Sequence, residues 1–190
     1  MRKISDTDLS SAIETLEASI AGSRERLPEE LFLFISRHTP VLCVDLLVRN
    51  AAGETLLTWR DDEHFGRGWH LPGGVVRFKE SRADRIKAVA RAELGAEVTF
   101  DEVPAAIQEY IHRGKRDRSH HVSFLMRCTL ASPPDAGLRC RSIAAPGRGE
   151  WMWHRTAPRD LIEVHQPYAD FLNDAVSVSD TVCIHLPLIN

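Results

Sequence analysis

Hydrophobic and polar residues follow a helical period at the start of the chain. Apolar side chains recur at the spacing of one helix face, with charged residues on the opposite side, and this predicts a helix over 7–25 that carries Leu9, Ala12, Ile13, Leu16 and Ile20. Gly22 and Pro28 interrupt the pattern, and Glu29 to Arg37 predicts a second, shorter helix.

Runs of apolar residues predict strands over 41–48, 55–59, 105–112, 121–130 and 151–153. A hairpin turn is predicted over 50–54, and loops rich in Pro and Gly over 132–137 and 144–149. Two further helices are predicted over 81–94 and 167–176, the first with Ser81 at its start and Gly95 just past its end. Strands mixed with a few helices predict an α/β (α+β) fold in which helices cover a mixed sheet.

Composition narrows the class of protein. A chain of 190 residues with 43% hydrophobic content suits one enzyme-sized domain, and a net charge of -3 gives no electrostatic reason to bind nucleic acid or an anionic membrane. No apolar run approaches a membrane span, and no apolar signal segment follows Met1, so we expect a cytoplasmic protein. The four cysteines are scattered without CxxC pairing, which favours free thiols.

The candidate chemistry lies around Gly73-Gly74 and the helix that follows it. Two adjacent glycines let the backbone bend sharply and approach a ligand closely. Glu80 stands where the predicted helix starts, and Glu93 follows about three and a half turns later. Carboxylates beside a bare glycine turn can hold a hard divalent ion such as Mg²⁺ through oxygen atoms. The alternative for Glu93 is a solvated carboxylate on the helix surface.

This segment resembles the Nudix box, with Gly74, Glu80, Glu93, Gly95 and Ala96 in register. Ala88, Val89 and Ala92 stand where the family usually has Arg, Glu and Glu. The resemblance implies a Nudix-type helix–mixed sheet–helix sandwich with an extra N-terminal helix. It implies a helical extension over 1–27, a Nudix domain over 28–176 and a C-terminal tail over 177–190.

The reduced acid cluster resembles the GDP-mannose mannosyl hydrolase branch, which uses one Mg²⁺ and cleaves at the anomeric carbon of the sugar. That resemblance implies Mg²⁺, with Mn²⁺ as an alternative, on the Gly73 carbonyl and Glu93. Arg60 matches an arginine that meets the diphosphate, and a planar guanidinium suits phosphate oxygens; the alternative is a surface arginine. Asp45, His112 and His121 are implied to bind the substrate. Asp45 lies inside an apolar strand, where a lone acid is costly unless paired.

The catalytic loop departs from the branch, whose Gln-His pair is replaced here by the stretch from Ala145 to Trp151. Arg148 stays protonated and cannot be the base, so Glu150 is the candidate for base or ligand, with His154 as a weaker substitute. We therefore expect a Mg²⁺-dependent hydrolase of a nucleoside diphosphate sugar. The alternatives are a pyrophosphohydrolase that attacks phosphorus and an inactive nucleotide-binding domain. The apolar stripe of the 7–25 helix predicts a contact with the domain or with a second subunit, as in a homodimer.

Overall fold

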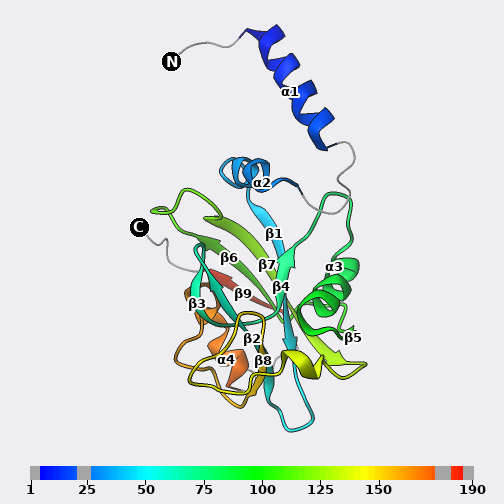
Figure 1. Cartoon of the computed structure of the whole chain (residues 1–190), viewed down its shortest axis with the longest axis vertical. Coiled ribbons are helices and arrows are strands. Elements are labelled where there is room, and N and C mark those ends of the chain that lie inside the picture. The colour runs from blue at the N-terminus through cyan, green and yellow to red at the C-terminus, as the bar shows by residue number, and fades with distance from the viewer. Residues whose placement is uncertain (1–4, 21–26, 174–180, 186–190) are drawn as a thin grey trace.

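The computed structural model describes residues 5–20, 27–173 and 181–185, and two β-sheets form its body (Figure 1). The larger sheet has the strand order β4-β1-β7-β6-β9, with β5 paired to β7. It comprises β1 (Val41–Val48), β4 (Gly73–Val75), β5 (Val98–Phe100), β6 (Ala106–Ile111), β7 (His120–Leu130) and β9 (Val182–His185). The smaller sheet has the order β3-β2-β8, formed by β2 (Thr55–Asp62), β3 (Gly66–His70) and β8 (Trp151–His154).

Pairing in the larger sheet is mixed. β1 and β7 run parallel over eight residue pairs from Val41 to Val48, and β6 and β9 are also parallel. The β1–β4, β5–β7 and β6–β7 pairs are antiparallel, as are both pairs of the smaller sheet. β4 is an edge strand, because its ladder partner in the described part of the chain is β1.

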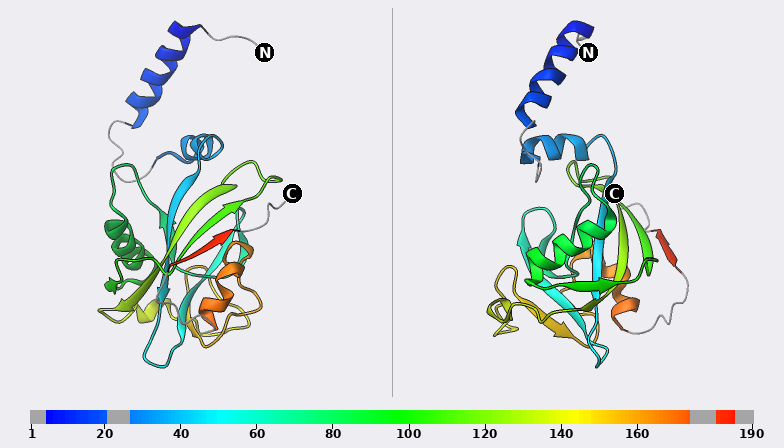
Figure 2. Two further views of the ribbon diagram at one scale, coloured as in Figure 1. Left: turned by 180° about the vertical axis from the view of Figure 1, so that it is seen from behind. Right: turned by 90° about the vertical axis from the view of Figure 1, so that its right-hand side faces the viewer.

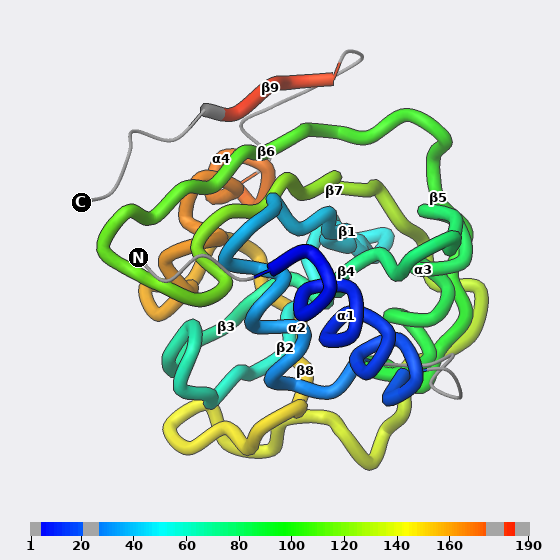
Figure 3. Tube along the Cα trace, turned by 90° about the horizontal axis from the view of Figure 1, so that it is seen from above, coloured from blue at the N-terminus to red at the C-terminus, as the bar shows by residue number. Residues whose placement is uncertain are grey.

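Helices cover both faces of the larger sheet. α3 (Arg82–Val89) continues into a π-helical turn, Ala90–Leu94, on one face, while a 3-10 helix, Glu163–Tyr168, and α4 (Ala169–Leu172) lie on the other (Figures 1 and 2). A shorter 3-10 helix spans Ala136–Leu138. α1 (Asp6–Ile20) and α2 (Glu29–Ser36) lie at one end of the molecule (Figure 1), so in the view from above they lie in front of the sheets (Figure 3). The predicted helix–mixed sheet–helix sandwich is confirmed.

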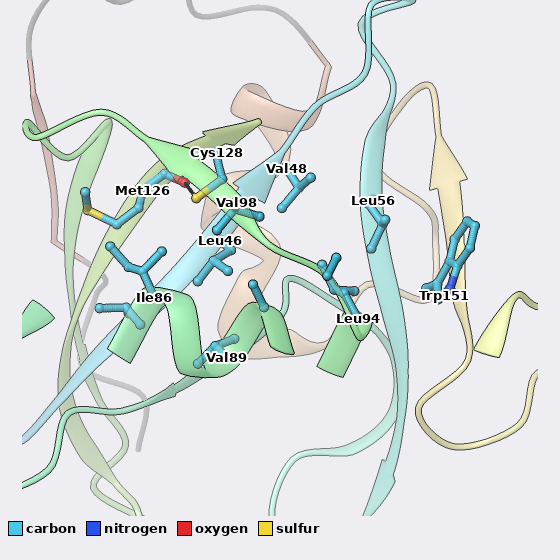
Figure 4. Close-up of a cluster of buried hydrophobic side chains, with 13 residues drawn as sticks. Leu46, Val48, Leu56, Ile86, Val89, Leu94, Val98, Met126, Cys128 and Trp151 are labelled. Carbon is cyan, nitrogen blue, oxygen red and sulfur yellow. Dashed lines mark hydrogen bonds between the residues drawn. The ribbon is translucent and has the colours of Figure 1, made fainter. Parts of the chain in front are cut away.

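β1 separates two hydrophobic cores because its side chains alternate between the two faces of the sheet. Val44, Leu46 and Val48 pack with α3, the π turn and Trp151 (Figure 4). Leu47 points to the other core, which includes Trp59, Trp69, Tyr168 and Phe171. Asp45 belongs to this second face, so the acid inside the apolar strand points toward the smaller sheet and the 3-10 helix.

Most of the predicted elements are present. The Ser81 hydroxyl accepts a hydrogen bond from Asp84 N–H at 3.0 Å and caps α3, and Gly95 is left-handed with φ 60°. The π turn, β3, β4, β5 and β9 were not predicted. Residues 182–185, which we assigned to a tail, form β9 beside β6. In place of the closing helix predicted over 167–176, a 3-10 helix ends at Tyr168 and α4 spans Ala169–Leu172, and residues 174–176 lie outside the described part.

α1 stands away from both sheets (Figures 1 and 2). It has no buried residue, and Leu9, Ile13 and Leu16 are 50%, 46% and 44% exposed. The described part of this chain therefore does not bury the apolar stripe. Residues 21–25 of the predicted helix lie outside the described residues. Among the helices that the structure describes, none has the length and apolar character needed to cross a bilayer.

Candidate active site

Glu93 lies in the π turn at the end of α3, beside the edge strand β4. Its Oε1 accepts a hydrogen bond from Gly73 N–H at 3.1 Å, and its Oε2 is 3.1 Å from the Thr58 hydroxyl of β2. The side chain is 27% exposed. A widened helical turn, the edge of the larger sheet and the smaller sheet therefore meet at this carboxylate, and π turns occur often at functional sites.

The Gly73 carbonyl also points away from β1. Leu46 N–H donates to Pro72 O and Val76 N–H donates to Leu42 O, both at 2.8 Å. In an antiparallel ladder these bonds make Asp45 and Gly73 a non-hydrogen-bonded pair, whose backbone groups point outward. Because Gly73 N–H reaches Glu93, the Gly73 C=O on the same edge lies on the Glu93 side.

This arrangement fits a magnesium ion with few protein ligands. Within residues 5–20, 27–173 and 181–185, no cluster of three or more His, Cys, Asp or Glu side chains could hold a metal ion. The Gly73 carbonyl and the Glu93 carboxylate supply two oxygen atoms. Mg²⁺ keeps several water molecules and takes substrate phosphate oxygens, so two protein oxygens are compatible with it.

The electrostatics of Glu93 suit cation binding. Burial raises the pKa of Glu93 to about 7, against the lowering effects of Gly73 N–H, the Arg60 charge and the Thr58 hydroxyl. Burial also lowers the pKa of His70 well below its usual value, and the Arg60 charge adds to that effect. A divalent cation near Glu93 would favour the ionised carboxylate.

Asp45 lies against Gly73 and is held by three side chains. A Cβ on Gly73 would be 2.4 Å from Asp45 Oδ1, so a glycine is required there. The Ser123 hydroxyl donates to Asp45 Oδ2 at 2.5 Å, Tyr168 donates at 3.2 Å, and His165 Nε2 is 3.4 Å from Oδ1. Burial alone would raise the pKa of Asp45, but His165 and the hydrogen bonds hold that pKa below its ordinary value.

Arg60 and His121 face the same region from opposite sheets. The Arg60 guanidinium lies 5.1 Å from the centre of the Phe65 ring, and its Nε is 3.4 Å from Asp62 Oδ2. His121 stacks on Tyr110 with ring centres 4.8 Å apart, and it contacts Phe65 edge-on at 6.4 Å. Burial lowers the pKa of His121 to about 4, although the Asp45 charge opposes that shift.

Glu150 has its contacts within its own loop, whereas His112 approaches the site through Tyr110, whose ring centre lies 6.4 Å from that of His112. His112 lies in the turn after β6, where its Nδ1 accepts from Gly114 N–H at 3.1 Å. Glu150 Oε2 accepts from Gly147 N–H at 2.9 Å within its own loop. Thr58, which contacts Glu93, pairs across the strands with Trp151. Glu150, one residue earlier, therefore projects toward the other face of the smaller sheet.

The sequence did not reveal several side chains that support the site. Thr58, His70, Ser123, His165 and Tyr168 are buried polar residues in apolar surroundings. Thr58 and His70 are paired across the β2–β3 ladder, which the sequence spacing alone does not specify. His165 reaches Leu71 from 94 positions away in the chain. The one signal for them in the sequence is a polar residue inside or beside an apolar run.

A separate cavity of about 300 Å³ lies outside this cluster. It is lined by residues of β1, β5, β7 and α4, including Arg49, Asp101, Arg127 and Phe171. None of the predicted site residues lines this cavity. Glu93, Gly73 and Asp45 therefore lie apart from this cavity.

Comparison with known proteins identifies a relative in sequence and solved structures with a similar fold. No protein-family model matches the sequence. The low-salt glycan biosynthesis protein Agl8 of Haloferax volcanii is 36% identical over 108 residues, which cover 55% of this chain and 69% of that protein.

Solved structures with the same fold are more distant in sequence. An ADP-ribose pyrophosphatase from Streptococcus suis matches with a TM-score of 0.53 and 17% identity, over 77% of this chain and 100% of that one. A NUDIX hydrolase from Nitrosomonas europaea matches with a TM-score of 0.53 and 16% identity, over 78% and 81%. The ORF135 protein of E. coli matches with a TM-score of 0.51 and 20% identity, over 75% and 96%.

Proposed function

The chain belongs to the Nudix hydrolase superfamily, and from that premise we propose that it is a Mg²⁺-dependent hydrolase of a GDP-mannose-like nucleoside diphosphate sugar, in which water attacks the anomeric carbon. The observation that carries this proposal is the meeting of the Glu93 carboxylate and the outward edge of Gly73 beside the positive charge of Arg60. One carboxylate and one carbonyl suit a single ion rather than a cluster of metals.

Each residue has a role in this proposal. Glu93 and the Gly73 carbonyl would hold the ion, and Mg²⁺, when bound, would supply positive charge toward the diphosphate leaving group. The Arg60 guanidinium adds charge on the diphosphate from the smaller sheet. Asp45 is fixed by three donors and orients the sugar nucleotide, while His121 and His112 contact the substrate from β7 and the turn after β6.

The sequence relative supports the class of substrate. Agl8 is named for glycan biosynthesis, and glycan chemistry uses activated sugars. The reduced acid cluster, with Val89 and Ala92 on the helix that carries Glu93, supports attack at carbon with one ion. The reaction consumes water, breaks the bond between the anomeric carbon and the diphosphate oxygen, and yields a free sugar and a nucleoside diphosphate.

The sequence predicts that Glu150 is the general base. To reach a water molecule near Glu93, its carboxylate would have to leave Gly147 N–H and turn to the other face of β8. The placement of Glu150 favours a second candidate function, a Nudix domain that binds a nucleotide without turnover. Attack at phosphorus, as in a pyrophosphohydrolase, is the alternative within enzymes.

Product analysis separates these functions. Nucleotide sugars are first screened with Mg²⁺ for an increase in melting temperature, and each hit is then incubated with the protein. The proposal expects free sugar and nucleoside diphosphate. Sugar phosphate and nucleoside monophosphate would indicate a pyrophosphohydrolase, and binding without any product would indicate the nucleotide-binding domain.

A further inference from the structure

Two buried imidazoles hydrogen-bond the backbone of Leu71, one at its carbonyl and the other at its amide. His70 Nδ1 is 2.7 Å from Leu71 O, and Leu71 N–H donates to His165 Nδ1 at 3.0 Å. The ring centres are 6.0 Å apart, and both residues are almost fully buried, at 5% and 6% exposure. These contacts come from β3 and from the 3-10 helix Glu163–Tyr168, so they join two distant parts of the chain.

The backbone partners fix the tautomer of each histidine. A carbonyl oxygen can only accept, so the Nδ1 of His70 carries the hydrogen. An amide N–H can only donate, so the Nδ1 of His165 presents its lone pair, and the hydrogen of the neutral ring is on Nε2. The two rings are therefore held as opposite tautomers by one residue of backbone.

The remaining nitrogens lead to the two acidic residues of the site. His165 Nε2 points to Asp45 Oδ1 at 3.4 Å. His70 Nε2 is 2.9 Å from the Thr58 hydroxyl, which lies 3.1 Å from Glu93 Oε2. His165 thus links the Leu71 backbone to Asp45 directly, and the Thr58 hydroxyl lies between His70 and Glu93, where its single hydrogen is donated to Glu93 Oε2 or to His70 Nε2, one at a time.

Leu71 lies two residues before Gly73 in the chain. Pro72 lies between them, and its ring fixes φ and restricts Leu71 to extended conformations. Pro72 O is also held by Leu46 N–H at 2.8 Å. With Leu71 held on both sides, the chain has little freedom before Gly73, whose N–H bonds Glu93 and whose Cα lies against Asp45.

We propose that His70 and His165 are positioning residues that clamp the Leu71 backbone and thereby orient Gly73, Glu93 and Asp45 toward a Mg²⁺–diphosphate ligand. The inference rests on the proposed function for the identity of that ligand. The clamp itself is a property of the protein alone. If the two histidines were merely structural, replacing them would lower the stability of the fold. Hydrogen exchange at the Gly73 amide and ligand affinity would then change only as far as that lower stability explains.

Two substitutions separate the functions of His165. His165→Asn keeps an acceptor near the Nδ1 position for Leu71 N–H and loses the donor to Asp45. His165→Gln keeps a donor near the Nε2 position for Asp45 and loses the acceptor for Leu71. His154→Asn is the matched control, because His154 is also buried, at 8% exposure, and packs on Trp69 with ring centres 4.6 Å apart.

The first measurement uses nuclear magnetic resonance without any ligand. Nitrogen-15 spectra should show the hydrogen of His70 on Nδ1 and that of His165 on Nε2. Amide hydrogen exchange at Gly73 should speed up at least about 10-fold in His165→Gln, which frees Leu71, and change less in His165→Asn and His154→Asn. The opposite tautomer at His165, or unchanged Gly73 exchange in a folded His165→Gln, would overturn the clamp.

The second measurement is the affinity of Mg²⁺–GDP by calorimetry. Both His165 variants should bind about 10-fold more weakly, the lower end of the loss expected when a residue that orients ligands is removed. His154→Asn should bind like the wild type. Wild-type affinity in both His165 variants would reject the role in ligand binding. If the wild type binds Mg²⁺–GDP but hydrolyses no nucleotide sugar, the proposed reaction fails while the clamp is still decided by the Gly73 exchange.

Discussion

Glu93 is the residue on which the proposed chemistry depends most. We expect Glu93→Gln to fold normally, because the side-chain amide oxygen can still accept from Gly73 N–H, and its NH₂ group can donate to the Thr58 hydroxyl oxygen in place of the bond that Thr58 donates to Glu93. Hydrolysis should fall at least ~10²-fold, the order lost when a group that stabilises developing charge is removed. The matched control is Glu97→Gln, which removes an exposed carboxylate bonded to Arg91. Full activity in folded Glu93→Gln would reject the metal-ligand assignment.

The pKa of Glu93 also predicts a pH dependence of stability. Burial raises this pKa from 4.5 to about 7, so between these values the folded protein binds more protons than the unfolded chain. The contribution of Glu93 to the free energy of unfolding should therefore decrease as pH rises from about 4.5 to about 7, and level off above it. Urea unfolding of the wild type and Glu93→Gln with a chelator present measures the difference. Parallel pH profiles would contradict the shift.

Glu150 is tested by its own substitution. If Glu150 is the general base, Glu150→Gln should lower kcat more than it weakens substrate binding, and the acid limb of the pH–rate profile should disappear. The loop must then turn the carboxylate away from Gly147 during catalysis. Turnover at the wild-type rate with an intact acid limb would assign the base elsewhere, in agreement with the position of Glu150 in this structure.

At the scale of elements, local signals in the sequence predicted the helices and long strands well. Ser81 and Gly95 bracket the helix of the glycine motif because capping depends on neighbouring residues alone. β4 and β9 are short or terminal, and they become strands only through their pairing with β1 and β6. The π turn that carries Glu93 has no pattern that distinguishes it from the end of an ordinary helix.

Unlike the elements that form the two sheets and cover them, α1 stands away from the rest of the chain. It buries none of its residues in this chain, and Leu9, Ile13 and Leu16 form an exposed stripe. We expect deletion of residues 1–25 to convert a dimer into a monomer, with Ile13→Asp giving the same shift and Ser11→Asp, on the polar face, giving none. Sedimentation of each variant measures the mass. The same mass with and without residues 1–25 would contradict this role.

At the scale of the whole molecule, the site combines segments that are far apart in the sequence. Residues 45, 58, 73 and 93 come from four elements, and His165 adds a fifth. Resemblance to a motif indicated Glu93, Gly73, Asp45 and Arg60 because each lies in or beside the matching segments. The supporting contacts of Thr58, His70 and Tyr168 depend on strand register and on the return of the chain after β8. Those are tertiary features, which a single sequence does not encode locally.

The central claim is hydrolysis by attack of water at the anomeric carbon, and oxygen-18 labelling tests it most directly. GDP-mannose and Mg²⁺ are incubated with the protein in ¹⁸O-labelled water, and the phosphate-containing products are analysed by mass spectrometry. Attack at carbon predicts GDP without label, because the phosphate oxygens keep their original atoms. Label in GDP, GMP or mannose phosphate would place the attack at phosphorus and contradict the account, and so would the absence of any product.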